Sequence, residues 1–218
     1  MNLRDLIDEF RWEAADEAIT PFWTDAFLAR AASQAEQEAC RRGALILDSS
    51  SPFCSISFGA GDDLLQLDSR ILEIRRARLS GAGRRIYPIT VAQLDRNNEQ
   101  WESETGEPLA YVTDYQTGHI RLYPTPTAAD EIQLTVRRLP LADLVDDNDE
   151  PEIRPESHLG LVQWMLYRAY MRQDADTFNP NKAAAALAEF VREFGEKKSM
   201  RNEEWIREGN SLDVSPLA

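Results

Sequence analysis

The sequence predicts an α+β protein, in which helices from both ends of the chain form a bundle and the middle forms an inserted antiparallel β lobe. Apolar residues recur at helical spacing as far as about residue 48 and again from about residue 155. Between these stretches, short segments alternate apolar and polar residues and are separated by turns rich in glycine and serine. The periodicity therefore changes near Ser49 and returns near Ser157.

Two helices are predicted at the N-terminus. The first carries one apolar stripe, made of Leu3, Leu6, Ile7, Phe10 and Ala14. Pro21 breaks the pattern, and Thr24 or Asp25 can then cap a second helix over 26–42. Its buried stripe is rich in alanine, which allows close approach of neighbouring helices, and Gly43 is the expected stop.

The middle of the chain predicts several short strands. Strands are expected at 54–58, 65–67, 71–79, 86–89, 111–113, 120–122 and 132–136. Thr90 is expected to cap a short helix that ends before Trp101, and residues 114–118 are expected to form a hairpin turn. Short strands at this spacing favour a small sandwich or barrel over a parallel sheet.

Helical character returns after an acidic stretch that reads as an exposed linker. A helix over 157–172 presents two apolar faces, the second formed by Trp164, Tyr167 and Met171. Such a helix is either central in a bundle or shared with a partner. A final helix is expected from about Asn181 towards Arg207, followed by a tail that is flexible unless bound.

The need to bury the apolar stripes of the helices predicts how the elements are grouped into domains. Neither helix pair covers its apolar stripes well alone, so the two pairs are expected to pack together. The predicted organisation is a helical domain (1–48 and 155–208), an inserted β domain (49–142), an acidic linker (143–154) and a C-terminal tail (209–218).

The formal net charge of -14 disfavours sequence-specific nucleic-acid binding, because an acidic surface repels phosphate. No apolar run approaches the length of a membrane span, and the N-terminus lacks the shape of a signal peptide. The expectation is a protein used in the cytoplasm or in a particle assembled there. Cys40 and Cys54 are expected to be free thiols.

No motif for catalysis or for cofactor binding emerges from the sequence. His119 and His158 lie far apart, away from the cysteines, and read as ordinary surface residues. No phosphate-binding glycine loop or nucleophile elbow is present in the sequence. No catalytic, metal-binding or cofactor-binding residue is therefore predicted, and the expectation is a protein that is not an enzyme.

The basic residues are more localised than the acidic ones. Five arginines cluster in the β segment: Arg75, Arg76, Arg78, Arg84 and Arg85. They can face solvent or pair with nearby acids. Alternatively, they can form a contact surface for an acidic neighbour, including a second copy of the chain.

Four stretches together resemble the head-to-tail adaptor (connector, or neck) proteins of tailed bacteriophages. They are Trp23 to Leu28 with Ala35 to Ala39; Ile71 to Leu79; Gly106 to Pro108 with Ile120 to Pro126; and Leu159 to Tyr170 with Asp174 to Asp176, Lys182 to Ala184 and Phe190 to Gly195. They span nearly the whole chain in the order found in that family.

The resemblance implies a structural virion protein that forms a ring, commonly of twelve subunits, beneath the portal. The ring joins capsid to tail and lines the DNA exit channel, in a virion neck assembled in the host cytoplasm. In such proteins the C-terminal segment often reaches the portal, and tail or nozzle proteins bind on the opposite side. The resemblance implies no catalytic residue and no cofactor.

Three groups of residues are the candidate subunit or partner interfaces. They are the second face of the two-faced helix, the five arginines, and the C-terminal residues Ser211, Leu212, Val214 and Leu217. A flexible tail of this kind can become ordered when it binds a partner.

Two alternatives stay open at this point. One is another neck or tail component, such as a tail terminator or tail-tube protein, although long helices at both ends disfavour a tube built from continuous sheet. The other is a small enzyme or ligand-binding module, which predicts a deep pocket with convergent polar groups between bundle and β lobe.

Overall fold

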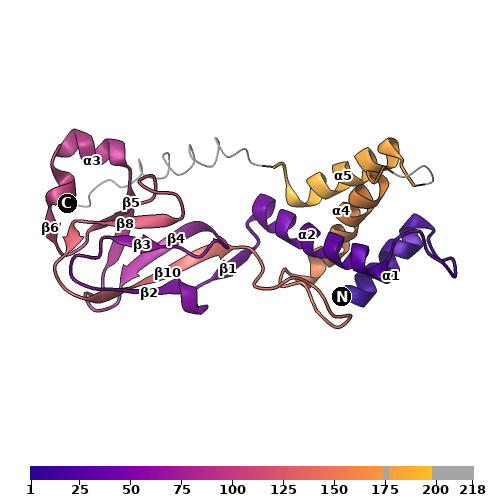
Figure 1. The fold of residues 1–218 in the computed structure, drawn as a ribbon, viewed down its shortest axis with the longest axis horizontal. Coiled ribbons are helices and arrows are strands. Elements are labelled where there is room, and N and C mark those ends of the chain that lie inside the picture. Colours follow the sequence, from indigo (N-terminus) through magenta and orange to yellow (C-terminus); the bar gives the residue numbers. More distant parts are fainter. Residues whose placement is uncertain (174–176, 198–218) are drawn as a thin grey trace. The chain divides into compact units, whose positions relative to one another are not determined.

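The structure is a computed structural model that describes residues 1–173 and 177–197. The described chain divides into two compact units (Figure 1). The helical unit contains Met1–Ile46 and Arg138–Lys197, and the sheet unit contains Leu47–Arg137. The helical unit is therefore assembled from two separated segments, whereas the sheet unit is one continuous segment. The mixed α+β class predicted from the sequence is confirmed.

Helices build the helical unit around one apolar core. They are α1 (Leu3–Ala14), α2 (Asp25–Gly43), the short 3-10 helix η3 (Pro155–Ser157), α4 (His158–Tyr170) and α5 (Pro180–Phe194). Helix α4 packs against α1, α2 and α5. Phe10, Leu28, Met165 and Phe190 are completely buried in the core that these helices share.

The first helix forms where its sequence pattern predicts. A capping box starts it, since the Asn2 side chain accepts a hydrogen bond from the Asp5 N–H and the Asp5 carboxylate accepts one from the Asn2 N–H. Leu3, Leu6 and Phe10 lie on its buried face. Local capping and one apolar stripe are thus sufficient to define α1.

The second helix extends one residue beyond the predicted range of 26–42 at each end. The Thr24 side chain caps it by accepting a hydrogen bond from the Phe27 N–H. Gly43 is the last helical residue, and Ala44 takes the left-handed conformation, with φ of 50°. A Cβ atom on Gly43 would lie 2.6 Å from the Leu45 side chain, so glycine here allows close packing.

The C-terminal helices are shorter than predicted. Helix α4 covers most of the expected range, but α5 ends at Phe194 rather than near Arg207. Gly195 follows with φ of 89°, a backbone conformation that ends the helix and that favours glycine. Residues 198–218 lie outside the described residues.

The acidic stretch 143–154 is not simply an exposed linker. Leu144 and Ile153 are buried in the core of the helical unit. The Leu144 N–H donates to Ser33 Oγ at 2.9 Å, and the Glu152 and Ile153 N–H groups donate to the Glu36 carboxylate. The linker was predicted from the acidic charges and the two prolines of residues 143–155, which do not reveal the two buried apolar residues, nine positions apart.

Short strands dominate the sheet unit. They are β1 (Ile46–Asp48), β2 (Ser55–Phe58), β3 (Leu64–Gln66), β4 (Ile71–Leu79), β5 (Arg85–Ile89), β6 (Thr105–Gly106), β7 (Ala110–Val112), β8 (His119–Tyr123), β9 (Thr125–Pro126) and β10 (Asp130–Arg138). Three short helices accompany them: η1 (Pro52–Cys54), α3 (Val91–Asn97) and η2 (Trp101–Ser103). A capping box on Thr90 starts α3, at the predicted position.

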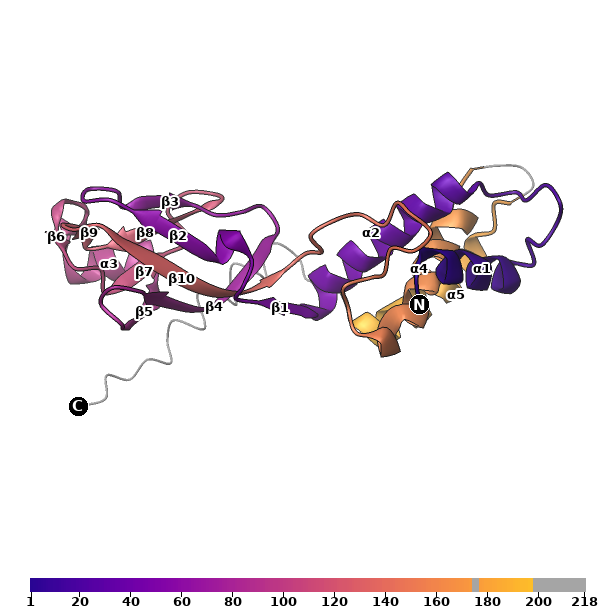
Figure 2. The ribbon, with the colours of Figure 1, turned by 90° about the horizontal axis from the view of Figure 1, so that it is seen from below.

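Eight of these strands form one curled, mostly antiparallel sheet, a half-barrel (Figure 2). Its order is β1-β10-β4-β5-β7-β8-β3, and β2 also pairs with β10. The predicted hairpin is confirmed, since β7 and β8 pair antiparallel and Gly118 has φ of 73° in the turn. Strands β6 and β9 pair separately.

Two features of the sheet differ from the sequence prediction. Strand β5 pairs with β7 in parallel, because α3 and the residues after it carry the chain back before β7 begins. Strand β1 lies where the sequence predicted only the end of the helical domain. Its three residues are too few for an alternating pattern to be recognised.

The sheet unit has its own apolar cores. The larger one gathers Ala77, Leu79 and Ile86 from β4 and β5 with inward residues of β8 and β10. A smaller one forms beneath α3 from Leu94, Trp101 and Val112. These cores fix which face of each strand is exposed, and thereby position the arginines of β4 and β5.

Candidate interaction surfaces

The arginines of β4 and β5 lie on two different faces. Ala77 pairs with Ile86 and Arg78 with Arg85 in the antiparallel register of these strands. Since Ala77 and Ile86 are buried, Arg78 and Arg85 point away from the core.

The same register places Arg76 beside Tyr87 on this outer face. We call Arg76, Arg78, Arg85 and Tyr87 the arginine face. Tyr87 is 44% exposed, and the Arg85 guanidinium lies 5.6 Å from the centre of its ring. Among the described residues, none of these three arginines forms an ion pair with a carboxylate, so their charges are free to meet a partner.

Arg75 and Arg84 do not belong to this surface. The guanidinium of Arg75 pairs with Glu73 at 2.9 Å, and that of Arg84 pairs with Glu107 at 3.2 Å. Arg84 also donates to the Pro108 carbonyl at 2.8 Å. Arg75 and Arg84 therefore pair with nearby acids, as one of the two interpretations of the cluster expects. A contact surface made by the other three arginines stays a prediction.

The second apolar face of α4 is mostly occupied within the chain. The Trp164 ring lies 5.1 Å from the Phe190 ring of α5 and 5.2 Å from the Tyr167 ring. Trp164 and Tyr167 are partly buried against the core, while Met171 is 44% exposed. Packing against α5 thus accounts for the two-faced pattern of α4, and Met171 is the most exposed of the three side chains.

Exposed apolar side chains gather at one end of the helical unit. They are Trp12, Ile19, Phe22, Met171 and Phe178. Trp12 lies on α1 and the others lie in or next to loops. These loops meet, since Trp23 contacts Tyr170 edge to face at 5.9 Å and the Asn179 N–H donates to the Tyr170 carbonyl. The sequence analysis did not predict this group of exposed apolar residues. The one sequence feature that could have indicated it is that Trp12 lies off the buried stripe of α1.

A buried carboxylate holds the loop between α1 and α2 at this end. Asp16 accepts hydrogen bonds from the Phe22 N–H at 2.8 Å and from the Trp23 N–H at 3.4 Å. The Arg11 guanidinium balances its charge at 3.0 Å. The loop is therefore fixed in place although its apolar side chains are exposed.

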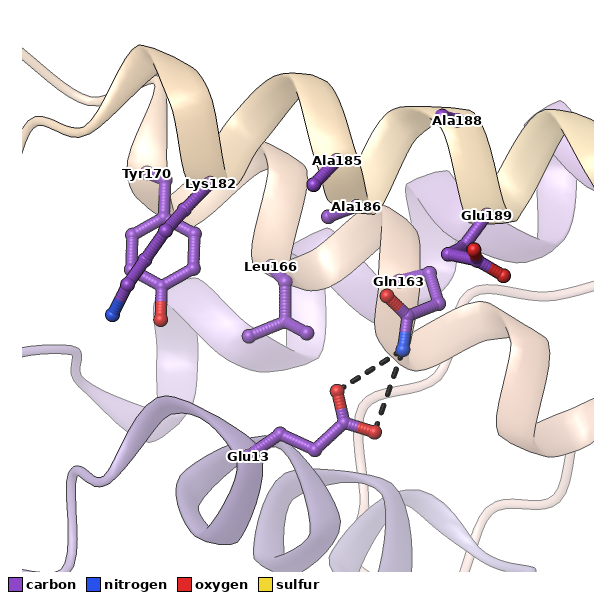
Figure 3. Close-up of a pocket in the computed structure, with 9 residues that line it drawn as sticks. All are labelled: Glu13, Gln163, Leu166, Tyr170, Lys182, Ala185, Ala186, Ala188 and Glu189. Carbon is purple, nitrogen blue, oxygen red and sulfur yellow. Dashed lines mark hydrogen bonds between the residues drawn. The ribbon is translucent and has the colours of Figure 1, made fainter.

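An open groove of about 400 Å³ runs between α1 and α5 over α4 (Figure 3). Its apolar lining comes from Leu166, Tyr170, Ala185, Ala186 and Ala188. Glu13 and Glu189 carry negative charge at one end, and Lys182 lies near Tyr170 at the other end (Figure 3). Gln163 Nε2 donates to the Glu13 carboxylate at 3.0 Å and orients it.

The most unusual titratable group is buried under the acidic segment. Burial raises the pKa of Glu36 from 4.5 to about 7, against the opposing effect of two backbone N–H donors, those of Glu152 and Ile153. Glu152 in turn pairs with Arg138 at 2.8 Å. Burial therefore disfavours the charged form of the carboxyl that anchors this segment.

The cysteines and histidines form no common site in the part of the chain that the structure describes. Cys40 and Cys54 are free and buried, and burial raises the pKa of Cys40 to about 12. His158 is buried rather than on the surface, because its ring nitrogens bond to the Met1 backbone and to the Ile153 carbonyl. No three His, Cys, Asp or Glu side chains gather as a metal site between residues 1 and 173 or 177 and 197.

The C-terminal candidates Ser211, Leu212, Val214 and Leu217 lie outside the described residues. No described helix is long and apolar enough to cross a bilayer. The surfaces available for recognition in the described chain are thus the arginine face, the groove and the exposed apolar end.

The family model of the SU10 adaptor protein matches residues 1–212. The chain belongs to this family. No curated protein matches the chain. Membership confirms the resemblance to phage head-to-tail adaptors and implies a structural, non-enzymatic protein of the virion neck. It also implies association with portal and tail components.

Proposed function

We propose that this adaptor forms a closed ring beneath the portal, joins the capsid to the tail and lines the channel through which DNA leaves. The observation that carries the proposal is the family match over residues 1–212. A ring of twelve copies, assembled in the host cytoplasm, is the form that the resemblance implies.

The charge of the chain supports a role at a DNA channel. Each copy carries a formal net charge of -14, so a ring would concentrate negative charge around its lumen. Carboxylates repel phosphates over roughly a Debye length, about 8 Å at physiological salt. DNA would then pass through the ring during packaging and ejection without adhering to it.

The division into two units supports a protein with two attachment tasks. We propose that the helical unit acts as a helical bundle domain and the sheet unit as an inserted domain, and that each offers its own surface to neighbours. The C-terminal tail, 209–218, is proposed to reach the portal, and a tail or nozzle protein is proposed to bind on the opposite side of the ring.

A phage that lacks this protein tests the proposed function. We expect DNA-filled heads without attached tails, because the ring is the joint between them, and electron microscopy of lysates measures this directly. Supplying the wild-type chain in trans should restore tailed particles. Tailed, infectious particles in its absence would contradict the proposal.

A further inference from the structure

Two surfaces of the chain combine apolar groups with charges of opposite sign. The arginine face projects the aromatic ring of Tyr87 between cationic neighbours on the outer side of β4 and β5. The Arg85 guanidinium stacks at 5.6 Å from that ring. This surface therefore offers an apolar ring flanked by positive charge.

The groove of the helical unit offers the opposite pattern. Its floor is apolar, with Leu166 and Tyr170 contributing from α4 (Figure 3). The groove is open to solvent and has a volume of about 400 Å³. Glu13 and Glu189 supply negative charge at one end of the groove (Figure 3).

The charges of the groove are held in different ways. The Glu13 carboxylate is exposed. Among the described residues, its one side-chain hydrogen-bond donor is Gln163. Because Gln163 is neutral, the negative charge of Glu13 is uncompensated. Glu189 pairs with Arg192 on the outer side of α5. Lys182 lies over the Tyr170 ring at 5.1 Å, at the other end of the groove. Glu13 is therefore the principal anionic group available to an incoming cation.

We propose that the arginine face of one copy docks into the groove between α1 and α5 of the next copy. In this arrangement Tyr87 enters the groove, and Arg78 and Arg85 approach Glu13 and Glu189. The contact joins two different surfaces of the same sequence. Such a heterologous interface generates a ring when its rotation closes. The inference rests on the proposed ring and names the surfaces that build it.

Charge reversal on either surface tests this contact. One variant carries Glu13→Arg and Glu189→Arg, and the other carries Arg78→Glu and Arg85→Glu. Each variant alone places like charges opposite each other. We expect each to need at least a hundred-fold higher concentration for half-maximal ring assembly on the purified portal, measured by sedimentation and negative-stain microscopy.

Mixing the two variants separates contacts between copies from contacts within one chain. In an equimolar mixture, a reversed groove meets a reversed face at one contact, and a native groove meets a native face at the next. Every contact then brings opposite charges together, so the mixture should assemble rings in which the two variants alternate. A contact within one chain would leave the mixture unassembled, and that result would overturn the proposal.

The apolar part of the contact has its own test. Tyr87→Ala should weaken assembly by about ten-fold or more, because an exposed aromatic ring loses its burial in the groove. Tyr87→Phe should assemble like the wild type. Equal assembly by the alanine variant and the wild type would contradict the docking of Tyr87.

Matched reversals at exposed positions elsewhere provide the control. Arg96→Glu on α3 and Glu156→Arg in η3 change the charge by the same amount per site and should leave assembly unchanged. Circular dichroism of every variant verifies folding. If reversal of the arginine face abolishes binding to DNA while both reversed variants still assemble rings, the face binds phosphate and the proposed contact is wrong. If the wild type forms no ring on the portal, the proposed function fails instead.

Discussion

The helical unit and the sheet unit are built from the chain in opposite ways. The helical unit joins two segments separated by the whole of 47–137, and contacts such as that between Met1 and His158 close it. The sheet unit is one continuous segment with its own cores. The helical unit therefore depends on contacts between segments that are distant in sequence, whereas the sheet unit is formed within one segment.

The two units both bury charged groups, but they differ in the one whose pKa is raised towards neutrality. The sheet unit buries the Asp48 carboxylate, which accepts from the Ser51 N–H, and Arg121, which lies between two aromatic rings. The helical unit buries Glu36, and burial raises the pKa of this carboxyl to about 7. We therefore expect pH near neutrality to act on the helical unit through Glu36.

Truncating one core residue in each unit should lower the stability of that unit more than the stability of the other. Phe190→Ala should destabilise the helical unit by about 3–5 kcal/mol, since the ring is completely buried and contacts Trp164 and Phe194. Leu134→Ala should destabilise the sheet unit by about 2–5 kcal/mol.

Hydrogen exchange, resolved by peptide, measures both effects. Each substitution should increase exchange mainly in its own unit. Equal loss of protection in both units from either substitution would contradict the independence of the two units.

The pH dependence of the helical unit should come largely from Glu36. Its pKa is raised in the folded protein from 4.5 to about 7, so its stabilising contribution is complete below pH 4.5 and is lost as pH rises through 7. A shift of this size corresponds to about 3 kcal/mol.

Urea unfolding of the wild type and of Glu36→Gln isolates this effect. The neutral amide oxygen can accept the same two backbone hydrogen bonds without becoming charged. The wild type should lose about 3 kcal/mol relative to the variant between pH 4 and pH 8. Parallel pH curves for the two proteins would rule out the assignment to Glu36.

The acidic segment should depend on its buried hydroxyl anchor. Ser33 Oγ accepts from the Leu144 N–H at 2.9 Å, and Ser33→Ala leaves that buried N–H without its partner. We expect a loss of about 2 kcal/mol in the free energy of unfolding, measured by urea titration. Gln37→Ala removes an exposed contact to Asp143 and is the control, with an effect within about 0.5 kcal/mol. Equal effects of the two substitutions would show that the segment is not anchored at Ser33.

The smallest expected effect lies in the sheet unit. Thr90→Ala removes the side chain that accepts from the Gln93 N–H at the start of α3 and should cost about 1 kcal/mol. Thr90→Ser keeps the hydroxyl and should restore most of this stability in a thermal melt. If serine and alanine melt at the same temperature, the cap contributes nothing.

Local patterns determined much of the fold. The stripe and capping box of α1, the Thr90 cap of α3 and the hairpin of β7 and β8 were all predictable, because each depends on residues near one another in sequence. The parallel pairing of β5 with β7 and the burial of the acidic segment depend on distant partners, so periodicity and charge could not reveal them.

The candidate surfaces, like the fold, were predictable only where they depend on residues near one another in sequence. The sequence located the arginine cluster, but only the register of β4 and β5 separates Arg76, Arg78 and Arg85 from the paired Arg75 and Arg84. The groove combines three helices from both ends of the chain, so no local motif marks it. The apolar faces of α4 were visible in the sequence, but their cover by α5 was not.

Electron microscopy of this adaptor assembled on its portal tests the central claim most directly. We expect a closed ring of copies beneath the portal, with Tyr87 of each copy in the groove between α1 and α5 of its neighbour. A ring with Tyr87 exposed would contradict the proposed contact alone. A chain that joins neither the portal nor the virion would contradict the proposed function itself.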